Sequence, residues 1–151
     1  MDKPVSAITV DTSKVEAMIA RTQSRLSAAD RACEVVARLI RDDILSNTRA
    51  GKDVWGAAFR PYSARYAKYR EDNHRSSDTV TLMYRNHMLP AMEVVRISGG
   101  ASIRFNSQLE RSKARKHNEG IGLPKRHFFG VSADTRRKSM VKFREILARI
   151  K

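Results

Sequence analysis

The stretch VVRISGGASIRFN, residues 94–106, decides the fold class. It holds two short runs with β-branched residues, 94–98 and 101–106, on either side of the pair Gly99–Gly100. Glycine adopts the positive φ angles that a tight turn between paired strands requires, so this spacing is typical of an antiparallel hairpin. We therefore expect a small antiparallel sheet here and interpret the rest of the chain around it.

The N-terminal third shows helical periodicity. Apolar residues recur every three or four positions from Val15 to Leu26 and again from Ala32 to Ile44. Gly51 is well placed to end the second pattern. The two patterns fit either an antiparallel pair of amphipathic helices or one long bent helix, and both alternatives remain open.

The middle of the chain mixes loops with short elements. Residues 52–61 are expected to form an ordered loop, because they include Trp55 and Phe59, and a short helix is expected over 61–72. Residues 79–83 have the β-branched composition of a strand. Residues 107–116 are polar and strongly basic.

A final helix is expected after Ser132. Its apolar face comprises Met140, Phe143, Ile146, Leu147 and Ile150. These elements predict an α+β fold, in which N-terminal amphipathic helices and a C-terminal helix pack on a small antiparallel sheet. We expect a single domain over residues 1–151, with a helical part at 1–50 and an α+β region at 51–151.

The charge is strongly positive and unevenly distributed. The chain carries 30 Lys and Arg against 16 Asp and Glu, a net charge of +14, and residues 101–151 alone carry 14 basic and 4 acidic residues. Such a region favours an acidic or polyanionic partner. The densest basic run comprises Arg111, Lys113, Arg115, Lys116 and Lys125. We expect DNA or a partner protein to face this run, although a solvated surface explains the run equally well.

The sequence lacks the usual catalytic and metal-binding patterns. The single cysteine, Cys33, excludes an intrachain disulfide and a cysteine-only zinc site. His117, Asn118, Glu119 and His127 could be imagined as a metal or nuclease centre, but their spacing matches no compact zinc signature. No apolar run reaches the roughly 18 residues of a membrane span. We expect no enzymatic activity, no metal, no cofactor and no membrane association.

The stretch RPYSARYAKYR, residues 60–70, places three tyrosines on one helical stripe, with basic residues beside them: Tyr62, Tyr66 and Tyr69. Aromatic and basic side chains together can bind a nucleic-acid strand, because the rings stack on bases and the positive charges attract phosphates. An aromatic stripe at helical spacing is first a packing signal, however. We therefore expect the tyrosines to pack this helix on the core.

A series of short motifs runs through residues 50–151 in a distinctive order. It comprises Gly56-x-x-Phe59-x-Pro61-Tyr62-Ser63, Val80-Thr81-Leu82, Met88-Leu89, Ile103-x-Phe105, Ala114-x-x-His117-Asn118-x-Gly120 and Pro124-x-Arg126-x-Phe128-Phe129-Gly130. In this order and spacing the chain resembles the virion-morphogenesis, or tail-completion, family of tailed bacteriophages, Mu-like phages included. One departure is His127, where the family usually has the second proline of Pro-Ala-Arg-Pro-Phe.

The resemblance implies a non-enzymatic virion component at the head-proximal end of the tail or in the neck, where it lets the finished tail join the DNA-filled head. It implies a subunit of an oligomeric ring, which we expect to be a hexamer, in contact with neck, connector and tail-tube proteins. Two uses of the basic region stay open in such a ring: contact with DNA in the lumen and salt bridges between subunits. The expected location is the virion, after assembly in the host cytoplasm.

We expect Arg126, Phe128 and Phe129 to shape a subunit interface, since a ring subunit needs surfaces that its neighbours complete. Two alternatives remain open. One is a basic nucleic-acid-binding module that uses residues 62–70 and 111–126. The other is a metal-dependent nuclease that uses His117 and His127.

Overall fold

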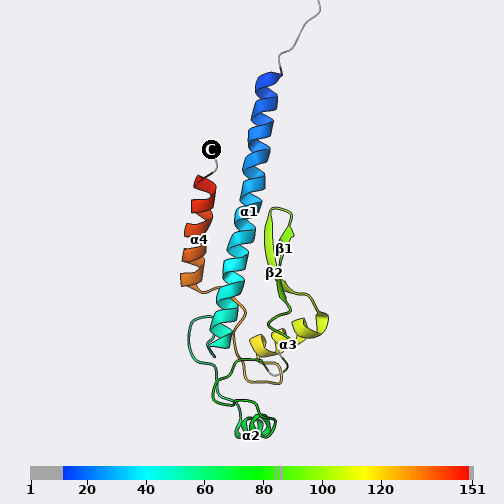
Figure 1. The fold of residues 1–151 in the computed structure, drawn as a ribbon, viewed down its shortest axis with the longest axis vertical. Helices are drawn as coiled ribbons and strands as arrows, with labels where there is room; N and C mark the ends of the chain where they lie inside the picture. Colours follow the sequence, from blue (N-terminus) through cyan, green and yellow to red (C-terminus); the bar gives the residue numbers. More distant parts are fainter. Residues whose placement is uncertain (1–11, 84, 86, 150–151) are drawn as a thin grey trace, which may run out of the picture.

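The protein is an elongated α+β molecule, seen in a computed structural model that describes residues 12–83, 85 and 87–149. The elements are α1 (Ser13–Arg49), α2 (Ala64–Asp72), β1 (Met92–Ile97), β2 (Gly100–Phe105), α3 (Gln108–Glu119) and α4 (Ala133–Ala148). Figure 1 shows α1 as the long axis, with the hairpin on one side, α4 on the other, and α2 and α3 near its C-terminal end. The predicted fold class, helices on a small antiparallel sheet, is confirmed.

The N-terminal third forms one continuous helix. α1 runs for 37 residues, so the alternative of an antiparallel pair is wrong. Residues 27–30 do not interrupt it, because they include two alanines, the residue with the highest helix propensity. A hydrogen bond from Arg31 Nη1 to Ser27 Oγ, 3.2 Å long, also spans this point. The helix ends before Gly51, as predicted.

The predicted hairpin is also confirmed. β1 and β2 pair antiparallel from Met92 opposite Phe105 to Ile97 opposite Gly100. The turn therefore consists of Ser98 and Gly99, and Gly99 has a φ of +74°. Gly100 already belongs to β2, which makes the turn one residue earlier than the Gly-Gly pair suggests.

α3 was not predicted from the polar composition of its segment. Its local signals are nonetheless clear, because Ser107 accepts a hydrogen bond from the backbone N–H of Glu110 and this S-x-x-E spacing is typical of a helix start. Gly120 ends the helix in the left-handed conformation, with φ +78°. The segment is helical because one narrow side of it, at Glu110 and Ala114, is buried against the rest of the chain.

Two other expectations are corrected. The helix expected from residue 61 begins at Ala64, because Ser63 is the residue that caps it. Residues 79–83 are not a strand: Val80 is buried, but Leu82 has a φ of +55°, which breaks an extended conformation. This segment fills the core without pairing to the sheet.

The buried core surrounds the C-terminal end of α1. Its members come from α1, the hairpin, α3 and the connecting loops: Ile44, Phe59, Val80, Met88, Leu89, Ala91, Met92, Phe105, Ala114 and Phe128. Phe59 anchors the ordered loop as expected, whereas Trp55 stays exposed, with its ring edge-on to the His127 ring and the two ring centroids 4.7 Å apart. The loops are thus as important as the helices in building this core.

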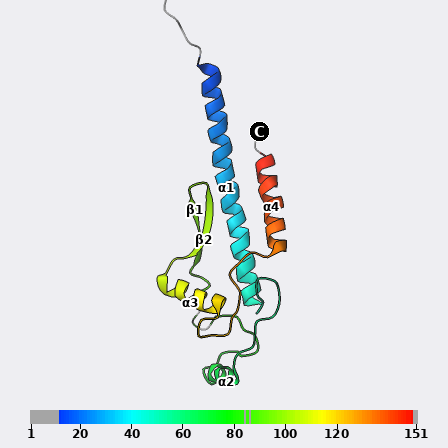
Figure 2. The ribbon, with the colours of Figure 1, turned by 180° about the vertical axis from the view of Figure 1, so that it is seen from behind.

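α4 packs along α1 on the side away from the hairpin, as both views show (Figures 1 and 2). Ser132 caps it, and Thr135 Oγ1 donates to Asp43 Oδ2 of α1 over 2.7 Å. Thr135 and Ser139 are buried, while Met140 of the predicted apolar face is exposed and Ile150 lies outside the described residues. None of the described helices combines the length and the apolar character needed to cross a membrane.

Candidate functional site: an arginine-rimmed cleft

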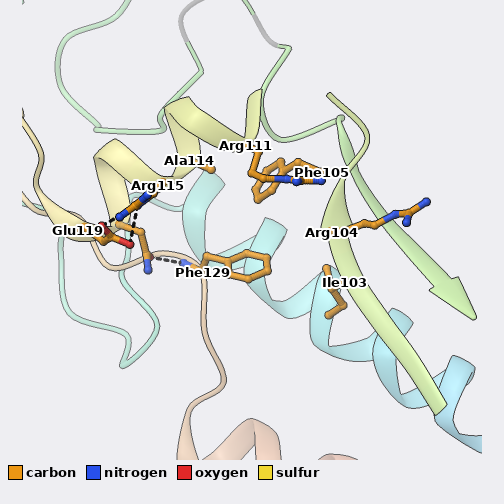
Figure 3. Close-up of a pocket in the computed structure, with 9 residues that line it drawn as sticks. Ile103, Arg104, Phe105, Arg111, Ala114, Arg115, Glu119 and Phe129 are labelled. Atoms are coloured by element: carbon orange, nitrogen blue, oxygen red, sulfur yellow. Dashed lines mark hydrogen bonds and ion pairs between the residues drawn. The ribbon is translucent and has the colours of Figure 1, made fainter. Parts of the chain in front are cut away.

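A cleft of about 290 Å³ opens between β2, α3 and the loop that follows α3. Figure 3 shows the side chains around it. They comprise Ile103, Arg104, Phe105, Arg111, Ala114, Arg115, Asn118, Glu119 and Phe129. We call this site the arginine-rimmed cleft, because its floor is apolar and its edge carries three arginines.

The local structure of α3 explains why two of these arginines stand together. Arg111 and Arg115 are four residues apart, so they share one flank of the helix. Ala114 and Asn118, also four residues apart, line the cleft beside them. Arg104 reaches the rim from β2 and extends away from Phe129 (Figure 3).

The three arginines differ in their charge partners. Arg104 pairs with Glu93, its neighbour across the hairpin, at 3.0 Å, and Arg115 pairs with Glu119 at 3.0 Å. No ion pair among the described residues involves Arg111. Its guanidinium is therefore the charge at this rim most available to an acidic partner.

The floor of the cleft is fixed by aromatic packing and one hydrogen bond. The rings of Phe105 and Phe129 have their centroids 5.6 Å apart. The backbone N–H of Phe129 donates to Asn118 Oδ1 over 2.9 Å, which ties the loop after α3 back to that helix. Phe129 is half-buried and stays accessible along one side.

The structure splits the predicted basic run. Arg111 and Arg115 reach the arginine-rimmed cleft, but Lys113 lies on the other flank of α3, where it pairs with Glu110 at 2.7 Å. Lys113 borders a separate hollow that His87 and His117 also line. Lys116 and Lys125 are exposed and line neither site. The structure thus places two of the five residues at the arginine-rimmed cleft, one at the separate hollow and two at neither.

Arg126 and Phe128 lie inside the chain. Arg126 is 4% exposed, and its Nε and Nη2 donate to the carbonyl oxygen of Arg60, each over 3.3 Å. Phe128 is 1% exposed and belongs to the core. Phe128 therefore offers almost no surface to a neighbouring subunit, and Arg126 offers only the little that lines a cleft beside Tyr62 and Leu123. Of the three residues predicted to shape an interface, Phe129 is the most accessible, and the interface role itself stays a prediction.

His117 lies partly buried on α3. Burial and, to a smaller extent, the positive charge of Arg126 together lower its pKa from 6.5 to about 4, so the ring is neutral at physiological pH. Its Nδ1 is buried without a hydrogen-bond partner among the described residues. Asn118, the next residue, uses its side chain to hold Phe129. In the described part of the chain, no group of three His, Cys, Asp or Glu side chains is placed to hold a metal ion.

The three tyrosines in α2 and just before it pack on the core only in part. Tyr62 is half-buried under the guanidinium of Arg126, which lies 5.3 Å from the ring centroid. Tyr66 and Tyr69 are exposed and stacked on each other, with centroids 6.0 Å apart. The expectation that all three tyrosines face the core is therefore wrong for two of them. Arg70, in contrast, is buried and lies over the Tyr62 ring.

Comparison of the chain with protein-family models, with curated proteins and with solved structures gave no significant match.

Proposed function

We propose that the chain is a structural virion protein of the phage head–tail junction, a subunit of an oligomeric ring that lets the tail join the DNA-filled head. The ordered series of short motifs over residues 50–151 supports the family, and the α+β fold agrees with it. In this proposal the protein acts by contact with its neighbours and turns over no substrate.

The observation that carries the proposal is the composition of the arginine-rimmed cleft. Arginine and aromatic residues are the types enriched at the centres of protein interfaces. Here Phe105 and Phe129 form an apolar floor beside Arg111, which has no ion-pair partner among the described residues. A phosphate backbone needs the charge but not the apolar floor. A partner protein with an acidic side chain beside an apolar one would use both.

The test uses particles assembled without the chain and then supplied with it. In its absence we expect filled heads and separate finished tails, seen by electron microscopy, and loss of infectivity. The wild-type chain should restore joined particles, whereas the double substitution Arg111→Glu and Arg115→Glu should restore few. A matched control, Arg136→Glu with Arg144→Glu on exposed positions of α4, should behave like the wild type. Joined, infectious particles without the chain would overturn the proposal.

A nucleic-acid-binding module is the second candidate, because the stacked and exposed rings of Tyr66 and Tyr69 stand beside Arg65 and Lys68. If the chain is such a module, it should bind single-stranded oligonucleotides tightly and lose affinity steeply as the salt concentration rises. Replacing both tyrosines with alanine should then weaken binding at least tenfold, since stacking contributes about 1–3 kcal/mol per base. Equal binding by the variant and the wild type would exclude it.

A further inference from the structure

The apolar side of α1 is one continuous stripe with a coiled-coil repeat. Its members follow one another at alternating intervals of four and three residues: Val15, Ile19, Thr22, Leu26, Ala29, Cys33, Val36 and Ile40. An interval that averages 3.5 keeps a stripe on one face over its whole length when a second helix packs against it. We call residues 13–40 along this face the α1 stripe.

The two halves of the α1 stripe have different surroundings. The first half belongs to residues 13–27, which we call the α1 stub, and the stub projects beyond the hairpin and α4 in both views (Figures 1 and 2). Every residue of the stub is exposed, with Val15 at 52% and Leu26 at 63%. Apolar side chains exposed in a row on one face mark a contact surface.

The second half of the α1 stripe lies at the bottom of an open groove of about 650 Å³. We call it the α1–α4 groove. Its floor includes Cys33, Val36 and Ile40, one wall is the hairpin with Ile97, and the other is α4 with Met140. Ile97 and Met140 are exposed, so nothing in the described chain covers the groove. Its lining is predominantly apolar, and Phe129 stands at its edge.

We propose that the α1 stub of a second copy of this chain occupies the α1–α4 groove, and that two copies do so reciprocally, with their α1 helices antiparallel. The stub and the groove floor lie on the same face of the same helix, at its two ends. Antiparallel pairing of two such faces therefore covers both stubs and both grooves at once. The resulting layers place Val15 against Ile40 and Thr22 against Cys33 of the other copy.

Length and charge support this occupant. The stub is about 22 Å long at 1.5 Å per residue, and the groove floor from Cys33 to Ile44 extends over about 16 Å, so one can lie along the other. The stub carries three basic residues and one acidic residue, whereas residues 28–49 of α1 carry four acidic and four basic residues and have no net charge. Antiparallel pairing brings the basic stub level with this neutral half, while parallel pairing would place two basic stubs together.

The first test measures the mass of the full chain in solution by sedimentation. We expect twice the chain mass of 17.1 kDa. Leu26→Glu, which puts a charge on the α1 stripe, should reduce the mass to that of one chain without loss of helix signal. Ser24→Glu, on the opposite side of the same helix turn, should leave it doubled. A wild-type chain that sediments at 17.1 kDa, whether its stub binds lipid vesicles or nothing, would overturn the proposal.

The second test fixes the orientation with Cys33, the only cysteine of the chain. Under mild oxidation Thr22→Cys should cross-link two chains through Cys33, because positions 22 and 33 of one helix are about 16 Å apart and cannot bridge within a chain. Adding Cys33→Ser should abolish the product, and Ser24→Cys should not form it. Cross-linking of the wild type through Cys33 alone, or a dimer in which Thr22→Cys does not react, would overturn the antiparallel arrangement.

This pairing does not depend on the head–tail assignment. A monomeric chain that still restores joined particles would remove the pairing and leave the proposed function in place. A chain that forms the dimer but is not needed for infectivity would remove the proposed function and leave the pairing in place.

Discussion

At the scale of single residues, Arg126 is a buried cation that holds two loops together. Its guanidinium bonds the carbonyl oxygens of Arg60 and Pro61 and lies over the ring of Tyr62. The site therefore links residues that are more than sixty positions apart in the sequence. Its burial lowers its pKa, since the charged form loses hydration, and the hydrogen bonds offset that loss.

Replacing Arg126 with alanine should destabilise the fold by about 2–4 kcal/mol, because two carbonyl groups lose their donor and a cavity opens beside Tyr62. Lys125→Ala is the matched control on the next residue, which is exposed, and its effect should stay within about 0.5 kcal/mol. Urea unfolding followed by circular dichroism measures both. If both substitutions lower the free energy of unfolding by the same small amount, Arg126 does not anchor the loops.

The stability of the chain should fall on acidification through His117. The unfolded chain takes up a proton there near pH 6.5, but the folded chain only near pH 4, so between these values the unfolded state binds more protons and stability rises with pH. His117→Gln should flatten this part of the profile, and His87→Gln, on an exposed histidine, should not. Urea unfolding from pH 7.5 to 4.5 provides the comparison. Identical profiles for His117→Gln and the wild type would contradict the assigned environment.

At the scale of elements, periodicity predicted what depends on local sequence. The helical periodicity between Val15 and Ile44, the hairpin around Gly99 and the start of the last helix after Ser132 were predicted, because caps, turns and repeats are set by neighbouring residues. Whether the first pattern forms one helix or two was left open. α3 was not predicted, because its segment has few apolar residues and the capping signal at Ser107 was not recognised in it. The burial of Arg126 and Phe128, and the exposure of Trp55, depend on loops that meet far apart in the sequence, and no local pattern encodes them.

The contact between α1 and α4 offers a test at this scale. Thr135 Oγ1 donates to Asp43 Oδ2 over 2.7 Å, so the two residues should be energetically coupled. In a double-mutant cycle of Thr135→Val and Asp43→Ala, we expect a coupling of about 1–3 kcal/mol, as for a hydrogen bond to a charged group. Additive effects on the free energy of unfolding would mean that this hydrogen bond does not help to hold α4 on α1.

At the scale of the whole molecule, the chain leaves much of its apolar surface uncovered. The main core cluster lies around the C-terminal end of α1, while the α1 stub, the α1–α4 groove and the arginine-rimmed cleft all face outward. The composition shows a basic chain, but it does not predict that three arginines line an apolar cleft beside one flank of α3. These uncovered surfaces are what a subunit of a larger assembly requires.

The most direct measurement of the central claim is the location and copy number of the chain in purified particles, determined by cryo-electron microscopy of the head–tail junction. We expect six copies in a ring at that junction. Infectious particles whose junction contains no copy of the chain would contradict the claim.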